Sequence, residues 1–225
     1  MKTLYFDCFC GASGDMIVGA LIDAGAGFEV VQKALESLGV PGLHVRAEKT
    51  TKKGIVATQF HVDEHHHDHG HEGHRHDHPH RHLADIQDLV EGADLPAKVK
   101  TDVLRTFQRI AECEASVHGT TVEEIHFHEV GAIDSIADIV GAHLAMHLLE
   151  IDRVVASPLP VGSGTVKTAH GILPVPAPAT AVLLKGAPSY AGDVPHEMIT
   201  PTGAALITQW ATAYGPMPPM SVESI

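Results

Sequence analysis

The chain has 225 residues, of which 44% are hydrophobic and 4% aromatic, enough for one large domain with an aliphatic core. Its 28 acidic residues outnumber 15 basic ones and give a net charge of −13, which excludes nucleic-acid binding through a general basic surface. No signal peptide is expected, and no apolar run approaches the ~18 residues that cross a bilayer, so no membrane partner is predicted. Three cysteines make no disulfide framework, and a cytoplasmic setting is expected.

The first part of the chain alternates predicted strands and helices. A buried strand is expected at 3–6 and helices at 16–24 and 28–38. Strands at 43–49 and 55–63, joined by a turn that contains lysine and glycine, predict a hairpin.

The turn between the first strand and the first helix carries polar groups. Strand, glycine-rich turn and helix can bind an anion at the helix N-terminus, with Ser13 as N-cap and Asp15 in the first turn. Asp7 follows the carboxyl end of the strand, where open α/β sheets place their sites. Asp7 and Asp15 are therefore candidate catalytic groups. Cys8 and Cys10 are expected to be small buried hydrophobes rather than nucleophiles.

A histidine-rich tract interrupts the pattern. Residues 61–82 contain eleven histidines and five acids, which cannot pack a core, so a disordered surface loop is expected over 64–82. Imidazole binds nickel, zinc, cobalt and copper alike, and the tract predicts transition-metal binding without selectivity. The alternative is a solvated loop without a role. The candidate ligands are His65, His66, His67, His69, His71, His74, His76 and His78.

A second group of metal-ligating side chains lies between 125 and 138. Helices are expected at 83–90 and 96–117, and then His126, His128, Glu129, Asp134 and Asp138 follow within thirteen positions. All five residue types can bind a divalent metal ion or move a proton. His126 and His128 alternate with Phe127, as in an extended segment that places both on one side.

The segment from 133 to 149 reads as a helix that is apolar nearly all the way round, which predicts burial. Asp134 and Asp138 are four residues apart and therefore share a face. A buried carboxylate is costly without a partner, so Asp138 is expected to have one. Asp134 has a second interpretation as a helix cap.

The last third combines short elements with proline-rich loops. A strand is expected at 154–156, and helices at 179–185 and 204–213. Lys167 and His170 precede an extended stretch with three prolines, which makes them candidate ligand contacts; a plain surface loop is the alternative. Thr200 is expected to cap the last helix, with Pro201 at its first position, and this helix N-terminus could hold a phosphate.

Several long blocks together resemble one family, the LarC family of nickel-pincer cofactor biosynthesis proteins, which are nickel insertases for lactate racemase. The matching blocks lie at 5–16, 80–83, 126–138, 158–162, 167–178 and 200–204. The resemblance covers almost the whole chain. It implies insertion of nickel into pyridinium-3,5-bisthiocarboxylic acid mononucleotide, in which two sulfurs and a ring carbon then hold the metal ion.

The resemblance also implies cofactors and partners. The family couples insertion to CTP hydrolysis with manganese or magnesium, and its CTP site lies in a second, C-terminal domain. Residues 1–225 are therefore expected to form the N-terminal domain, incomplete in activity alone, with that C-terminal domain and the lactate racemase maturation system as partners. Cys10 stands where serine is expected in many relatives, which argues against an essential thiol.

Roles follow from the chemistry that the resemblance implies. A nickel–carbon bond requires loss of a ring proton to a base, a histidine or a carboxylate such as His128, Glu129 or Asp138. The mononucleotide phosphate would contact Ser13, Lys167 or Thr200. A non-enzymatic nickel store or metallochaperone is the alternative function, and a metal-dependent hydrolase ranks third because the chain has no His-Glu-x-x-His motif. The expected fold is α/β, with helices packed on a mixed sheet.

Overall fold

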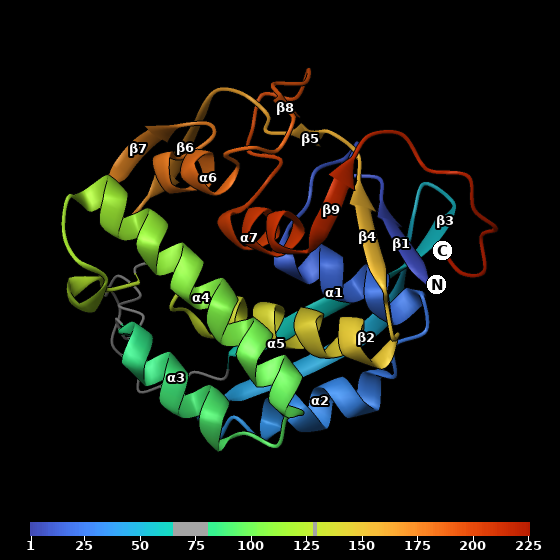
Figure 1. The fold of residues 1–225 in the computed structure, drawn as a ribbon, viewed down its shortest axis with the longest axis horizontal. Coiled ribbons are helices and arrows are strands. Elements are labelled where there is room, and N and C mark those ends of the chain that lie inside the picture. The colour runs from blue at the N-terminus through green and yellow to red at the C-terminus, as the bar shows by residue number, and fades with distance from the viewer. Residues whose placement is uncertain (65–80, 128–129) are drawn as a thin grey trace.

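The computed structural model describes residues 1–64, 81–127 and 130–225. A parallel sheet of three strands lies at one side of the fold, in the order β1 (Thr3–Phe6), β4 (Arg153–Ala156) and β9 (Ala211–Tyr214). Helices α1 (Gly14–Asp23), α5 (Ile133–Leu148) and α7 (Pro201–Trp210) lie beside this sheet (Figure 1). This arrangement confirms the α/β class.

Helix α5 is the centre of the core. Its residues 136–145 are all buried, and it contacts α1, α2 (Phe28–Glu36), α4 (Ala97–His118) and α7. A helix can be covered on every side only where its residues are small or apolar, and a Cβ on Gly141 would already lie 3.5 Å from Val18 and Val31 side chains. The predicted burial of this helix is confirmed.

The predicted hairpin is present and longer than expected. Strand β2 (Leu43–Lys52) pairs with β3 (Ile55–Glu64) in antiparallel register, and β3 packs against α1. A Cβ on Gly19 would lie 2.6 Å from the Thr58 carbonyl oxygen, so the glycine allows α1 to approach the strand closely. This contact brings β3 next to the N-terminus of α1.

The remaining elements cover the core or extend away from it. Helix α3 (Leu83–Gly92) packs on α4, and η1 (Val122–Glu124) follows α4. The other elements are α6 (Pro178–Leu183), the pair β5 (Leu159–Pro160) with β8 (Ser189–Tyr190), and the pair β6 (Thr165–Thr168) with β7 (Gly171–Pro174). In Figure 1, α6, β6 and β7 lie away from the parallel sheet, near the C-terminal end of α4. Within the described ranges, no helix is long and apolar enough to cross a membrane.

Two expectations about the strands were wrong. Instead of one mixed sheet, the described residues form a parallel sheet and separate two-stranded pairs. The last helix does not run over 204–213: it begins at Pro201 and ends at Trp210, and Ala211–Tyr214 forms β9. Alanine favours helix locally, but pairing with the free edge of β4 satisfies the backbone groups of this segment, and tertiary context overrides propensity.

Candidate functional site

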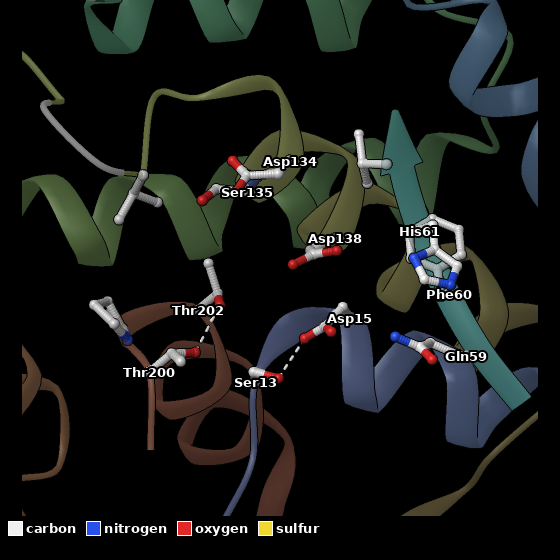
Figure 2. Close-up of a pocket in the computed structure, with 13 residues that line it drawn as sticks. Ser13, Asp15, Gln59, Phe60, His61, Asp134, Ser135, Asp138, Thr200 and Thr202 are labelled. Carbon is white, nitrogen blue, oxygen red and sulfur yellow. Dashed lines mark hydrogen bonds between the residues drawn. The ribbon is translucent and has the colours of Figure 1, made fainter. Parts of the chain in front are cut away.

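The N-terminal ends of α1, α5 and α7 meet β3 around a pocket of about 430 Å³ (Figure 2). Helix α1 and the residue before it contribute two side chains, α5 three, the segment before α5 one, the start of α7 three, and β3 four. The lining residues are Ser13, Asp15, Gln59, Phe60, His61, Val62, Val130, Asp134, Ser135, Asp138, Thr200, Pro201 and Thr202.

Two glycines allow these helices to meet. A Cβ on Gly14 would lie 2.5 Å from Asp138 Oδ2, and a Cβ on Gly203 would lie 2.3 Å from the Ala12 carbonyl oxygen. No side chain fits at such distances, so the Gly14 backbone lies directly against the Asp138 side chain, and Gly203 of α7 lies directly against the backbone of the turn before α1. The Gly14 N–H also donates to Thr202 Oγ1 at 3.3 Å, which joins the starts of α1 and α7.

The α7 end of the pocket is rich in hydrogen-bond donors. Thr200 is the N-cap, as predicted, and its hydroxyl accepts the Gly203 N–H at 3.2 Å while lying 3.0 Å from the Thr202 hydroxyl. Ser13 occupies the N-cap position of α1, but its hydroxyl donates to the Asp15 carboxylate instead of capping the helix. Helix N-termini carry partial positive charge, so this side of the pocket is suited to an anion.

Asp138 lies on the side of the pocket opposite α7 (Figure 2). It is 8% exposed, and its Oδ1 has no hydrogen-bond partner among the described residues. Burial raises the pKa of Asp138 to about 8, with smaller contributions from the charges of Asp15 and Asp134; the backbone N–H of Asp15 acts in the opposite direction. Asp15 faces Asp138 across the pocket (Figure 2). The expected partner of Asp138 is thus a backbone N–H, and it satisfies only part of the carboxylate.

Asp134 does not act as the N-cap of α5, because Ala132 holds that position. Asp134 lies in the first turn, where its Oδ1 accepts the Ser135 N–H at 2.7 Å, and it lines the pocket. An acid at this position also interacts favourably with the helix dipole.

Four candidates from the sequence lie elsewhere in the fold. Asp7 is exposed after β1, and the hairpin of β6 and β7 carries Lys167 and, at its turn, His170. The His170 ring lies 4.8 Å from the His118 ring, between centroids. None of these residues lines the pocket, and neither does His126. His128, Glu129 and the candidate histidines between 65 and 78 lie outside the described residues.

The structure adds residues that sequence reasoning missed: Gln59, His61, Ser135 and Thr202 line the pocket. His61 Nε2 lies 3.1 Å from Glu48 Oε1 on the neighbouring strand. His61 was counted with the histidine-rich tract, although it belongs to the alternating pattern of β3, and that pattern could have separated it. Among residues 1–64, 81–127 and 130–225, no three His, Cys, Asp or Glu side chains are placed to hold a metal ion together.

The cysteines near the site differ from each other. Cys8 is buried, as expected, and burial raises the pKa of its thiol to about 11, which makes it a poor nucleophile at neutral pH. Cys10 is exposed, so the expectation that it is buried was wrong. It lies in the loop that follows β1, outside the packed core.

The fold and the site together define an α/β protein whose pocket places buried and exposed carboxylates opposite helix N-termini, an arrangement suited to a cation and an anionic group together. The model of the family "Nickel insertion protein" matches residues 4–225, and the chain belongs to that family.

Curated relatives agree with this assignment. The chain is 49% identical to a pyridinium-3,5-bisthiocarboxylic acid mononucleotide nickel insertion protein of Desulfitobacterium hafniense, covering 100% of this chain and 54% of the relative. It is 44% identical to the protein of that name from Geobacillus kaustophilus (100% of this chain, 55% of the relative) and 48% identical to a putative nickel insertion protein of Geobacter sulfurreducens (100% and 56%). The chain therefore spans about half the length of these relatives. No solved structure matches it.

Proposed function

We propose that this chain carries the site at which Ni²⁺ is inserted into pyridinium-3,5-bisthiocarboxylic acid mononucleotide, the substrate in the names of two of its relatives. The observation that carries the proposal is the unpartnered Oδ1 of buried Asp138, in a pocket that also contains the donor-rich end of α7. An acceptor without a donor suits a cation or a proton from the ligand, and helix N-termini suit a phosphate. The substrate requires both, because it receives a metal ion and carries a mononucleotide phosphate.

Nickel is the cargo of this reaction, and the acidic side of the pocket is where we place it. Asp15 and Asp134 bring carboxylates to the pocket, and His61 adds an imidazole, a ligand that nickel accepts well. The described residues do not form a complete metal cage. We therefore assign them a transient contact with the ion, completed by the sulfur atoms that the substrate supplies. His128 and Glu129 remain proposed ligands on the evidence of the sequence.

The phosphate belongs, in this proposal, at the start of α7. The hydroxyls of Thr200 and Thr202 lie there beside the first backbone N–H groups of the helix, and Ser13 lies on the adjoining end of α1. This position puts the negative charge next to the positive ends of two helix dipoles. Lys167 and His170 stay candidates from the sequence, since neither lines the pocket.

The insertion step breaks a ring C–H bond, forms a nickel–carbon bond and releases one proton. We assign ionised Asp138 as the proton acceptor because it is buried, faces the pocket and has an oxygen free of donors; burial raises its pKa to about 8 and so keeps a proton on it below that pH, and the arriving Ni²⁺ favours the ionised form. Asp15 and Asp134 are more exposed and are better placed to meet the ion as it arrives. Asp7 remains a proposed catalytic group from the sequence, outside the pocket.

The test replaces Asp138 by asparagine, which keeps the shape of the side chain and removes the base. Insertion should fall about 100-fold or more, because general-base catalysis contributes that much. The assay follows the nickel-containing product by mass spectrometry and uses the protein at the length of its curated relatives, with CTP and Mn²⁺ or Mg²⁺. Asp88→Asn, which removes the same charge from an exposed position on α3, is the matched control. Insertion at the normal rate in Asp138→Asn, with the fold intact, contradicts the proposal.

CTP, its divalent cation and the lactate racemase maturation system come from the family resemblance, whereas the proposed cytoplasmic setting comes from the low number of cysteines. The described residues offer no three-ligand cluster for manganese or magnesium. We therefore propose that CTP and its ion bind in the part of the relatives that this chain does not match.

A further inference from the structure

A second cavity, of about 770 Å³, lies at the other ends of α5 and α7. Helix α7 is ten residues long, so the two cavities are about 15 Å apart along it, and they share no lining residue. The second cavity is lined by the first half of α4, the residues around the end of α5, the start of β4 and the end of α7. Its volume suits an organic molecule rather than a single ion. The proposed insertion chemistry does not use it.

Two arginines line the second cavity without a counter-charge. Arg105 is exposed on α4, and Arg153 is half-buried at the start of β4. Neither guanidinium group makes an ion pair or a hydrogen bond within the described ranges of the chain. The nearby carboxylate of Asp102 is already paired with Lys98 Nζ at 2.6 Å. A guanidinium group binds phosphate through two parallel hydrogen bonds, so this wall of the cavity is suited to a phosphate group.

Helix ends add to this positive character. Lys98 and Val99, in the first turn of α4, line the cavity, and the N-terminal end of a helix carries partial positive charge. The end of α5 carries partial negative charge, but Lys2 Nζ covers it by donating to the Leu149 carbonyl at 2.7 Å. The second cavity therefore favours an anion, although the chain as a whole has a net charge of −13.

Two acceptors at the same cavity lack hydrogen-bond donors. Glu150, two residues after α5, is exposed, and its carboxylate has no ion pair or hydrogen bond in the described part of the chain. Gln209 Nε2 donates to the Asp102 carbonyl at 3.0 Å, and the buried Oε1 of Gln209 has no donor among the described residues. An inorganic anion offers few donors, whereas the hydroxyls of a sugar donate to carboxylates, as in the recognition of ribose by acidic residues. The cavity thus presents partners for a phosphate and for hydroxyl groups together.

We propose that the second cavity binds a phosphorylated sugar, either free or as the ribose phosphate of a nucleotide. Arg105 and Arg153 bind the phosphate in this proposal, and Glu150 accepts hydrogen bonds from the sugar hydroxyls. The proposal stands on the cavity, the unpaired guanidinium groups and the free acceptors. It does not depend on the proposed function.

The binding is tested by the fluorescence of Trp210, which is the single tryptophan of the chain and lines the second cavity. The probe is ribose 5-phosphate, and ribose and inorganic phosphate are partial probes that each lack one of the two recognised groups. Ribose 5-phosphate should change the fluorescence of the 225-residue chain saturably. Half-saturation with either partial probe should require a concentration about tenfold higher or more, because one set of hydrogen bonds is lost. A response to ribose 5-phosphate that does not saturate, or half-saturation by inorganic phosphate at the same concentration, overturns the proposal.

Four variants locate the binding. Arg105→Gln and Arg153→Gln each remove one guanidinium group and should raise the half-saturating concentration of ribose 5-phosphate about tenfold. Glu150→Gln should lower the preference for ribose 5-phosphate over inorganic phosphate, because this side chain contacts the hydroxyls alone. Lys33→Gln removes an exposed charge on α2 and is the matched control, which should leave the titration unchanged. Unchanged titrations in both arginine variants, or an equal loss in Lys33→Gln, overturn the site.

Equilibrium dialysis with AMP, GMP, CMP and UMP separates the two sources of the sugar phosphate. Binding of one of them that is tighter than that of ribose 5-phosphate, and weakened in Arg105→Gln, assigns a nucleotide to the second cavity. Weaker binding of all four assigns a free sugar phosphate. Asp138→Asn should leave the Trp210 titration unchanged, so failure of the proposed function and failure of this site give different results.

Discussion

At the scale of single residues, Asp138 combines burial with incomplete hydrogen bonding. In the folded protein the pKa of Asp138 is about 8, whereas the same carboxyl group in an unfolded chain has a pKa near 3.8. Between these two pH values the native state binds the extra proton, so this residue lowers the stability of the fold as pH rises from about 4 to 8.

Asp138→Asn should therefore stabilise the fold in metal-free buffer. The gain in the free energy of unfolding should be near zero at pH 4, grow with pH, and level off above pH 8 at a maximum on the order of a few kcal/mol, and the melting temperature should rise with it. Thermal unfolding followed by circular dichroism with a chelator present measures it. A constant difference across this pH range would show that burial does not perturb this carboxyl group.

His143 is a second buried titratable residue, on the far half of α5. Trp210 Nε1 donates to His143 Nδ1 at 3.3 Å, so Nε2 carries the proton and donates to Thr106 Oγ1 at 2.7 Å. Thr106 in turn donates to the Asp102 carbonyl at 3.2 Å. This chain of hydrogen bonds requires a neutral imidazole, and burial lowers the pKa of His143 to about 4.

The sign of the pH effect at His143 is opposite to that at Asp138. The unfolded chain takes up a proton near pH 6.5 and the folded one only near 4, so stability is full above 6.5 and falls toward 4, by about 3 kcal/mol. His143→Gln should flatten this part of the stability–pH curve and cost about 1 to 3 kcal/mol at pH 7.5 through imperfect hydrogen bonds. Urea unfolding at several pH values tests this, and His147→Gln, at an exposed position, should leave the slope unchanged.

At the scale of elements, the pocket exists because helix ends meet without side chains between them. Gly203 lies against the Ala12 carbonyl, and the Thr200 N–H donates to the same carbonyl oxygen at 3.1 Å, while the Ala12 N–H donates to the Met198 carbonyl at 2.9 Å. The start of α7 is therefore tied to the turn before α1. A shift of either helix would move Thr202 away from Asp138.

Gly203→Ala should separate these helices. The added methyl group meets a backbone oxygen, which cannot turn aside, so we expect a loss of about 2 to 3 kcal/mol and slower insertion. Gly92→Ala is the matched control, because a Cβ there meets no atom within 4 Å and alanine favours helix. Urea unfolding measures the free energy of unfolding of both variants. Equal values would mean that α7 and the turn before α1 are not in close contact.

At the scale of the whole molecule, helix α1 starts after the carboxyl end of the parallel strand β1, and its first turn lines the pocket. Open α/β sheets bind ligands at this edge. The tract of residues 65–80 follows β3, a strand that lines the pocket, and contains nine histidines.

Removal of residues 65–80 should lower the number of nickel ions bound per chain and leave insertion intact at high nickel concentration, because the pocket residues remain. Equilibrium dialysis and the insertion assay measure the two quantities. Loss of insertion at saturating nickel, with an unchanged melting temperature, would mean that the tract takes part in the reaction itself.

Much of the fold was predictable from local sequence. Apolar periodicity and capping residues act within a few positions, so α1 to α7, the hairpin of β2 and β3, and the burial of α5 follow from the sequence within a few residues. The blocks shared with the family are also properties of the linear chain. The sequence alone therefore determined the α/β class, the family and the burial of the helix that carries Asp138.

Only the tertiary structure decided which residues share a site. It placed Asp15, His61 and Thr202 beside Asp138, and it left Asp7, Lys167 and His170 outside the pocket. It also brought Arg105 and Arg153 to one cavity. These outcomes depend on helix ends and strands that meet from distant parts of the chain, through backbone contacts at glycines. Neither periodicity nor spacing along the sequence contains that information, because non-local packing decides it.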